Sequence, residues 1–177
     1  MQVNQSGISA RAVAGRDLYH FAARENPFDI LYQKIKEETS KCSEFKETVD
    51  ILKRYIEPNR RDMRSLEQKL TDAELTQLIN YASEVKEIFA KKLTESQYLR
   101  SAQEFYAQML SKVRVDFNCK IYSRIGSIPK ELISAEVTEK VVSPNFDILG
   151  DNPLNLTTED VLGMIYYLTG NCHIDWK

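Results

Sequence analysis

The residues best suited to metal or nucleophilic chemistry lie at the two ends of the chain. The sequence has two histidines, His20 and His173, and the second stands in the closing segment "NCHID" beside Cys172 and Asp175. A zinc site needs about four ligands at a recognisable spacing, which this segment does not supply. Because neighbouring side chains of an extended segment point to opposite faces, Cys172 and His173 also make a poor nucleophile–base pair. We therefore expect Cys172, His173 and Trp176 to form a structural tail, with no metal and no cofactor.

A second candidate is the "GRD" segment of Gly15, Arg16 and Asp17. It lacks both glycine patterns that cradle phosphate groups, GxxxxGK[ST] and GxGxxG. A tight turn with solvated charges is the better interpretation. Nowhere does the sequence assemble a nucleophile, a base and an orienting group, so we predict that the chain is not an enzyme. An enzyme with a Cys172/His173 site is kept as a minor alternative.

A basic segment, "KRYIEPNRRDMR", could touch nucleic acid. Clustered lysine and arginine side chains bind phosphate groups without reading the base sequence. The competing interpretation is a solvated connection between helices, in which Glu57 and Asp62 balance the positive charges. The candidate residues for DNA contact are Lys53, Arg54, Arg60, Arg61 and Arg64.

Length and composition predict an ordinary globular protein. The chain has 177 residues, of which 42% are hydrophobic and 28% charged, and its net charge is −2. This charge excludes a basic field over the whole protein. The three cysteines are odd in number and widely spaced, which favours reduced thiols. There is no apolar run long enough to span a membrane and no signal-peptide pattern at the start, so we expect a cytoplasmic protein without membrane contact.

The opening residues 1–25 predict an extended arm. Apolar residues alternate with polar ones through "GISARAVAGRDLYHF", and the glycine inside it fits a turn or bulge between two short strands. An isolated hairpin is marginal in water, so this β-arm should pair with another copy or dock on its own domain. Apolar side chains would supply the buried contacts, and the Arg-Asp pair would fix the register. The interface candidates are Ile8, Val13, Arg16, Asp17, Leu18 and Tyr19.

The rest of the chain predicts a mainly α fold, a helical bundle with a long antiparallel hairpin. Asn26 fits an N-cap and Pro27 the first helical position. A second helix is expected before Pro58, which ends it. The residues that share the apolar faces of these two helices are Phe28, Leu31, Tyr32, Ile35, Phe45, Val49, Leu52 and Ile56.

Two long helices follow and predict the hairpin. Thr71 and Glu74 match a capping box at the start of the first, which runs to about Leu93. The second extends from about Glu95 to Ile125. Only the short segment "TESQ" lies between them, which favours an antiparallel hairpin. A single bent helix is the alternative.

A further helix is expected over residues 126–142, with Leu132, Ile133 and Val137 facing inward. Residues 143–156 are rich in Pro, Asn, Asp and Gly, which is typical of a surface loop or a boundary. The predicted division is therefore an arm at 1–25, a helical bundle at 26–142, and a C-terminal helix and tail at 143–177 that pack on the bundle.

The last helix carries boundary signals at both ends. Thr157 as N-cap and Asp160 three residues later resemble a capping box, and Leu156 with Val161 fits a hydrophobic staple. Gly170 fits the C′ position that stops a helix.

Two segments at opposite ends resemble parts of bacterial conflict systems. The opening "NQSGISARAVAGRDLYHF" resembles the segment that such proteins carry before a helical domain. The closing "TTEDVLGMIYYLTGNCHIDW" resembles the C-terminal domains of ABC three-component systems, which end in an apolar helix, a Thr-Gly-x-Cys-His-like turn and a tryptophan. Here that ending is Leu168, Thr169, Gly170, Cys172, His173 and Trp176.

The resemblance implies a role in bacterial antiphage defence. In such systems an SMC-like ABC ATPase works with a middle component and an effector, often a nuclease, and the C-terminal domain couples the effector to the complex. We expect a non-catalytic interaction and assembly module that forms homo-oligomers. No nuclease or protease domain precedes the arm, which suggests an isolated module, a separate subunit or a fragment. A nucleic-acid-binding subunit that uses Lys53 to Arg64 is the alternative.

Overall fold

A computed structural model describes residues 26–40, 52, 55–58 and 64–177. Within these ranges the structure is helical and contains no strand, which confirms the mainly α fold. The predicted β-arm and its interface candidates lie outside the described residues, as does most of the predicted helix before Pro58. Four of the basic candidates lie outside them as well: Lys53, Arg54, Arg60 and Arg61.

The elements form a bundle around the last helix. Short 3₁₀ segments are labelled η2, η3 and η4, and η5 is a single π-helical turn. In chain order the elements are α2 (Pro27–Ser40), α4 (Leu66–Asp72), η2 (Thr76–Leu78), α5 (Ile79–Glu95), α6 (Arg100–Lys120), η3 (Tyr122–Ser127), η4 (Lys130–Leu132), α7 (Ile133–Val137), η5 (Thr138–Val142), α8 (Ser143–Asp147) and α9 (Thr158–Gly170).

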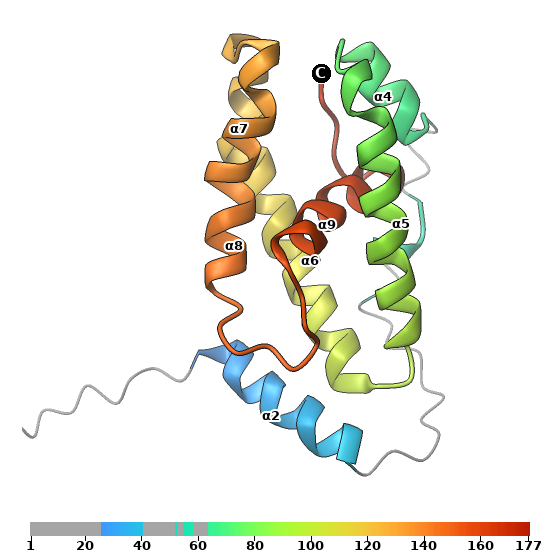
Figure 1. The fold of residues 1–177 in the computed structure, drawn as a ribbon, viewed down its shortest axis with the longest axis vertical. Helices are drawn as coiled ribbons and strands as arrows, with labels where there is room; N and C mark the ends of the chain where they lie inside the picture. Colours follow the sequence, from blue (N-terminus) through green and yellow to red (C-terminus); the bar gives the residue numbers. More distant parts are fainter. Residues whose placement is uncertain (1–25, 41–51, 53–54, 59–63) are drawn as a thin grey trace, which may run out of the picture.

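Helix α9 occupies the middle of the molecule. Figure 1 shows it with α5 on one side, α7 and α8 on the other, and α6 behind it. After its first turn α9 has no charged residue, and the sequence from Val161 to Thr169 is buried at every position except Leu162. A helix that is apolar all round is stable only when it is covered all round. The composition of this one segment therefore explains the central place of α9.

Gly163 allows α9 to approach α5 closely. A Cβ atom at this position would lie 2.6 Å from the backbone oxygen of Val85 and 2.8 Å from the Cβ atom of Phe89. Carbon atoms normally pack about 3.5–4.0 Å apart. The backbone of α9 therefore packs directly on the backbone of α5 at Val85, and position 163 has no space for a larger residue.

Helix α2 covers the outer side of α6. Asn26 caps it, since its Oδ1 accepts from the Phe28 N–H at 3.2 Å. The four predicted apolar residues of α2 are buried, and the Phe28 and Tyr32 rings lie 5.5 and 5.3 Å from the Phe105 ring. At the other end, the Glu38 carboxylate accepts from the Ser101 N–H at 3.1 Å. A carboxylate is favourable at the N-terminus of a helix, so α2 also caps α6.

The long hairpin is not confirmed. Helices α5 and α6 are separate, because the chain turns over Ser96–Leu99, where the Leu99 N–H donates to the Ser96 carbonyl at 3.1 Å. This excludes the single bent helix. The two helices meet through Phe89 and Tyr106, whose ring centroids are 5.8 Å apart. However, α5 packs mainly on α9, which occupies the space where a closed hairpin would place α6.

The capping box predicted at Thr71 and Glu74 is wrong. Thr71 lies in the last turn of α4, and Glu74 adopts a left-handed backbone with φ of 60° in the connection to η2. The actual capping box is formed by Ser65 and Gln68 at the start of α4. The Ser65 hydroxyl accepts from the Gln68 N–H at 3.2 Å, and the Ser65 N–H donates to the Gln68 side chain at 2.8 Å. Both segments fit the Ser/Thr-x-x-Glu/Gln pattern, so the pattern alone does not choose between them.

The segment after α6 departs from the prediction at two points. Helical structure continues from α7 through η5 to α8, so residues 143–147 are helical and not part of a loop. Leu132 was expected to face inward but is 52% exposed, whereas Ile133 and Val137 are buried. Ile56 of the earlier predicted stripe is also exposed. Along the described residues, no helix has the length and apolar character that crossing a membrane requires.

Candidate interaction groove and C-terminal anchor

The start of α9 is fixed by the predicted capping box. The Thr157 N–H donates to Asp160 Oδ2 at 2.7 Å, and the Asp160 N–H donates to the Thr157 hydroxyl at 3.3 Å. Asp160 is buried, and Lys92 of α5 lies 2.6 Å from its Oδ2. The ammonium group therefore neutralises the one carboxylate that α9 carries into the core.

The end of α9 is a Schellman turn in which the left-handed residue is Cys172. The Cys172 N–H donates to the Thr169 carbonyl at 3.1 Å, and the His173 N–H donates to the Leu168 carbonyl at 2.8 Å. Cys172 has a φ of 62°. The prediction that Gly170 is the C′ residue is therefore wrong, because Gly170 is the last helical residue and the turn comes two positions later.

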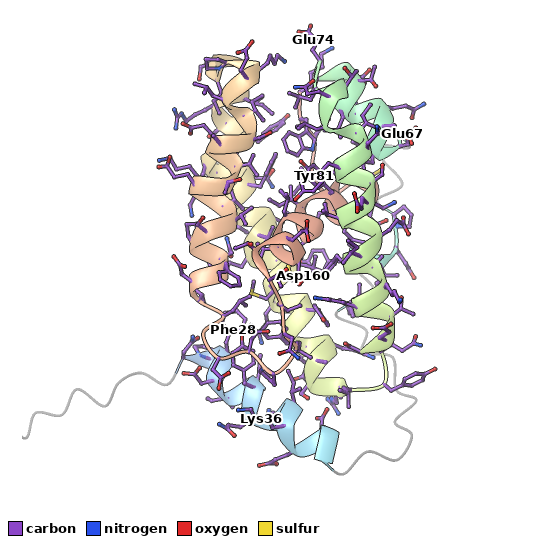
Figure 2. The ribbon with its side chains drawn as sticks, in the orientation of Figure 1. Phe28, Lys36, Glu67, Glu74, Tyr81 and Asp160 are labelled. Carbon is purple, nitrogen blue, oxygen red and sulfur yellow. The ribbon has the colours of Figure 1, made fainter. Side chains whose placement is uncertain are left out.

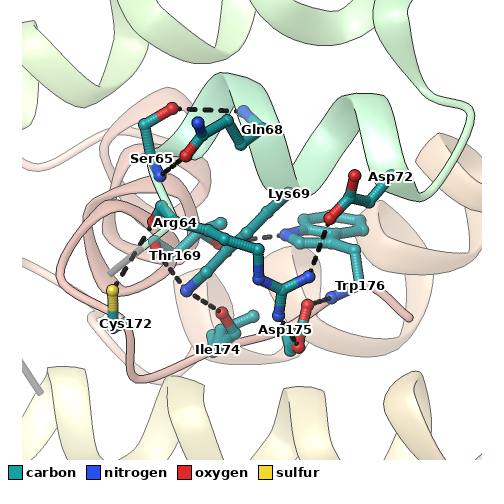
Figure 3. A network of polar contacts seen from close by, with 10 residues as sticks. All are labelled: Arg64, Ser65, Gln68, Lys69, Asp72, Thr169, Cys172, Ile174, Asp175 and Trp176. Carbon is teal, nitrogen blue, oxygen red and sulfur yellow. Dashed lines mark hydrogen bonds and ion pairs between the residues drawn. The ribbon is translucent and has the colours of Figure 1, made fainter. Parts of the chain in front are cut away.

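A buried lysine holds the C-terminal tail against the end of α9. Lys69 of α4 is 1% exposed, and its Nζ donates to the carbonyl oxygens of Thr169 at 2.9 Å and Ile174 at 3.2 Å. Figure 3 shows this ammonium group between the two carbonyls. Cations are favourable at helix C-termini, where carbonyl groups lack helical partners. The lysine thus links α4, α9 and the tail.

Trp176 is the apolar part of the same anchor. Its side chain is 2% exposed, and its indole N–H donates to the Thr169 hydroxyl at 3.0 Å. The ring lies edge-on to Phe117 at 4.8 Å and stacks on Tyr166 at 5.9 Å between centroids. A buried indole with its single donor satisfied fixes the chain direction as well as burying area.

Arg64 belongs to this anchor too. Its guanidinium group pairs with Asp72 at 2.9 Å and with Asp175 at 2.6 Å, and its backbone carbonyl accepts from the Cys172 thiol at 3.6 Å (Figure 3). Arg64, a candidate for DNA contact in the sequence analysis, therefore contacts the tail residues Cys172 and Asp175.

His173 packs against Tyr55. Its ring lies 5.5 Å from that of Tyr55 in an edge-on arrangement. In the ranges that the structure describes, no three His, Cys, Asp or Glu side chains come together as metal ligands would.

A groove runs along the face formed by α5, α9 and the α7–η5 helix. Its apolar end, a cavity of about 190 Å³, is closed by Trp176 of the tail. A wider end of about 430 Å³ adjoins it, since Tyr81, Thr138 and Leu162 line both parts. The other residues of the apolar end are Leu78, Ile133, Ser134, Val137 and Tyr166, and those of the wide end are Val142, Thr157, Thr158 and Glu159.

Tyr81 lies at the junction of the two ends and is 44% exposed (Figure 2). Its hydroxyl donates to Glu159 Oε1 at 3.2 Å. Partial burial, this hydrogen bond and the charges of Glu159 and Glu84 raise the pKa of Tyr81 above its ordinary value. Burial also raises the pKa of Tyr166, at the apolar end, to about 12. The wide end therefore carries one carboxylate, that of Glu159, beside the apolar cavity.

The sequence analysis missed the groove residues and Lys69. Tyr81 and Glu159 are ordinary helix-surface residues in the sequence, and only the packing of α5 on α9 brings them together. Lys69 is one of many lysines in the chain, and its burial has no local signal. The sequence analysis also made no prediction at Gly163, although a glycine inside a helix is a signal that could have predicted a close approach.

A comparison with known protein families identifies a matching domain family. The sequence model of C-terminal domain 9 of the ABC-three component (ABC-3C) systems matches residues 65–176. This range begins at the N-cap of α4 and ends at Trp176, so it contains the groove and the whole anchor except Arg64. No curated protein and no solved structure matches the chain significantly.

Proposed function

Since the chain belongs to the C-terminal domain 9 family of the ABC-three component systems, we propose that it is a non-catalytic interaction and assembly module of such a system. The family match carries the proposal, and it confirms the resemblance of the closing segment. The matched domain is a component of a multi-subunit system, so its partners are the other subunits of that system.

The roles of the tail residues support a non-catalytic module. The residues that looked most reactive in the sequence have structural contacts: Cys172 forms the turn after α9, His173 packs on Tyr55, and Trp176 fills the core. The buried carboxylate of Asp160 is held by Lys92 and by the helix cap. None of these groups lines the groove except Trp176, which closes its apolar end.

In this proposal the domain couples an effector, such as a nuclease, to the SMC-like ABC ATPase of an antiphage complex in the cytoplasm. Homo-oligomers would bring several effectors to one ATPase. Of the basic candidates for DNA contact, Arg64 alone lies within the described residues, and two carboxylates hold its guanidinium group, so the nucleic-acid-binding alternative stays a prediction.

Co-purification with the other subunits of the system tests the proposal. The tagged chain is expressed together with the ATPase and effector subunits, captured and analysed for mass and stoichiometry. We expect the tagged chain to retain at least one of them at a fixed ratio. A folded chain that retains neither subunit, under conditions in which those subunits still bind each other, would overturn the proposal.

A further inference from the structure

We propose that the groove between α5, η5 and α9 is the docking site for a partner segment that carries a large apolar side chain followed closely by a lysine or arginine. This inference rests on the proposed function, since it names the chemistry that the module recognises in another subunit. It is carried by the shape of the groove, its lining and its uncompensated negative charge.

The apolar end fits one large side chain. Leu78, Val137, Leu162 and Tyr166 form its walls, and Trp176 closes it. Its volume of about 190 Å³ equals about six water molecules in the liquid, each of which occupies ~30 Å³. Water in such a cavity makes few hydrogen bonds to apolar walls, so replacing it with an aliphatic or aromatic side chain is favourable.

The wide end selects a cation. Glu159 and Glu84 both act on the Tyr81 hydroxyl, and Glu159 accepts its hydrogen bond. No lysine or arginine lines either part of the groove, and within the described residues no cation lies within salt-bridge distance of Glu159 or Glu84. The nearby Asp160, by contrast, already has Lys92. A cation supplied by a partner would pair with Glu159 and steer the partner toward the groove.

Tyr81 connects the two ends. It is an exposed aromatic residue that lines both cavities, and residues of this kind often dominate the binding energy of an interface. The π-helical turn η5 lies on the opposite side, where Thr138 and Val142 line the groove. Single π-turns inside helices occur frequently at functional sites, which agrees with a binding role for this face.

Peptides that tile the ATPase and effector subunits of the system provide the probe. Each labelled 15-residue peptide is titrated with the full chain and its binding is followed by fluorescence anisotropy. We expect the binding peptides to contain an apolar residue near a lysine or arginine. Changing that cation to glutamate should weaken binding at least about tenfold, a loss typical of one good interfacial charge pair.

Variants of the chain locate the binding site. Tyr81→Ala and Glu159→Lys should each weaken peptide binding by about tenfold or more. Glu67→Lys is the matched control, because Glu67 is also an exposed glutamate at the second position of a helix and lies outside the groove (Figure 2). Tyr122→Ala controls for loss of an exposed aromatic residue. Both controls should bind as the unchanged chain does, and thermal unfolding verifies that all four variants are folded.

The outcomes separate this inference from the proposed function. If Tyr81→Ala and Glu159→Lys leave peptide binding and co-purification unchanged, the groove is not the site, although the chain remains an assembly module. If binding peptides lack a basic residue, or if no peptide binds while the intact subunits still co-purify, the stated partner chemistry is wrong. If the unchanged chain co-purifies with neither subunit, the proposed function itself fails.

Discussion

Replacing Gly163 with alanine places a methyl group where the packing of α9 on α5 leaves no space. The new carbon would lie 2.6 Å from the Val85 carbonyl oxygen and 2.8 Å from the Phe89 Cβ atom. The first obstacle is a backbone atom within a helix, so no side-chain rotation can relieve it. Helix α9 would have to move away from α5 by most of an ångström, and such a gap loses about a quarter to a half of each dispersion contact across it.

The expected net loss of stability is about 2 kcal/mol. Overpacking of a core typically costs about 1–3 kcal/mol, and a rigid backbone obstacle favours the upper end of that range. Alanine is about 1 kcal/mol better than glycine in a helix interior, which offsets part of the loss. For a chain of this size, a net 2 kcal/mol lowers the unfolding temperature by about 4–8 °C.

Thermal and urea unfolding of Gly163→Ala would measure this effect. Gly126→Ala is the control, because Gly126 is exposed and a Cβ atom there would meet nothing within 4 Å. We expect the control to stay within about 0.5 kcal/mol of the unchanged chain, as surface substitutions usually do. If Gly163→Ala is as stable as the control, α9 and α5 do not pack at the distance described, and the argument for a backbone contact is refuted.

Three further substitutions test the tail and the core. Cys172→Gly should stabilise the chain by about 1 kcal/mol, because the left-handed φ of 62° strains a residue with a side chain; a lower urea midpoint would contradict this. Lys69→Met should cost about 1–3 kcal/mol in urea unfolding, since the Ile174 carbonyl oxygen loses its lysine donor while the Thr169 carbonyl keeps the Cys172 N–H; unchanged stability would mean that another group satisfies the Ile174 oxygen. Burial raises the pKa of Tyr166 from 10.0 to about 12. The stability that its neutral hydroxyl contributes to the folded chain is therefore fully present below pH 10 and is lost as the pH rises to about 12. Tyr166→Phe should therefore reduce the loss of stability between pH 10 and pH 12 by about 2–3 kcal/mol, and equal losses in both proteins would argue against the burial of this hydroxyl.

The sequence predicted the features that depend on local chemistry. Asn26 and the Thr157–Asp160 pair cap helices as expected, because a cap forms within four consecutive residues. The apolar stripe of α2 is buried for a similar reason, since its spacing follows from the helix period. These features need no information about the rest of the chain.

Other features depend on competition between similar local signals. Ser65 and Thr71 both begin a capping-box pattern; the chain uses the first, and Leu70 and Leu75 are buried on either side of the left-handed turn at Glu74. The Schellman turn is a related case, in which Cys172 rather than glycine adopts the left-handed conformation. Residue preferences predict that a helix ends near such a position, but tertiary packing selects the residue.

The tail anchor and the groove are structurally coupled, because Trp176 is part of both. Its indole N–H is held by Thr169, whose carbonyl is held by Lys69, while its ring closes the apolar end of the groove. The polar groups of the anchor are thus engaged with one another within the chain. In the proposed docking site the tail contributes part of the wall of the apolar cavity, and Glu159 on α9 contributes the negative charge. A substitution in the anchor should therefore affect binding through the shape of the groove, and one at Glu159 through the charge of the partner.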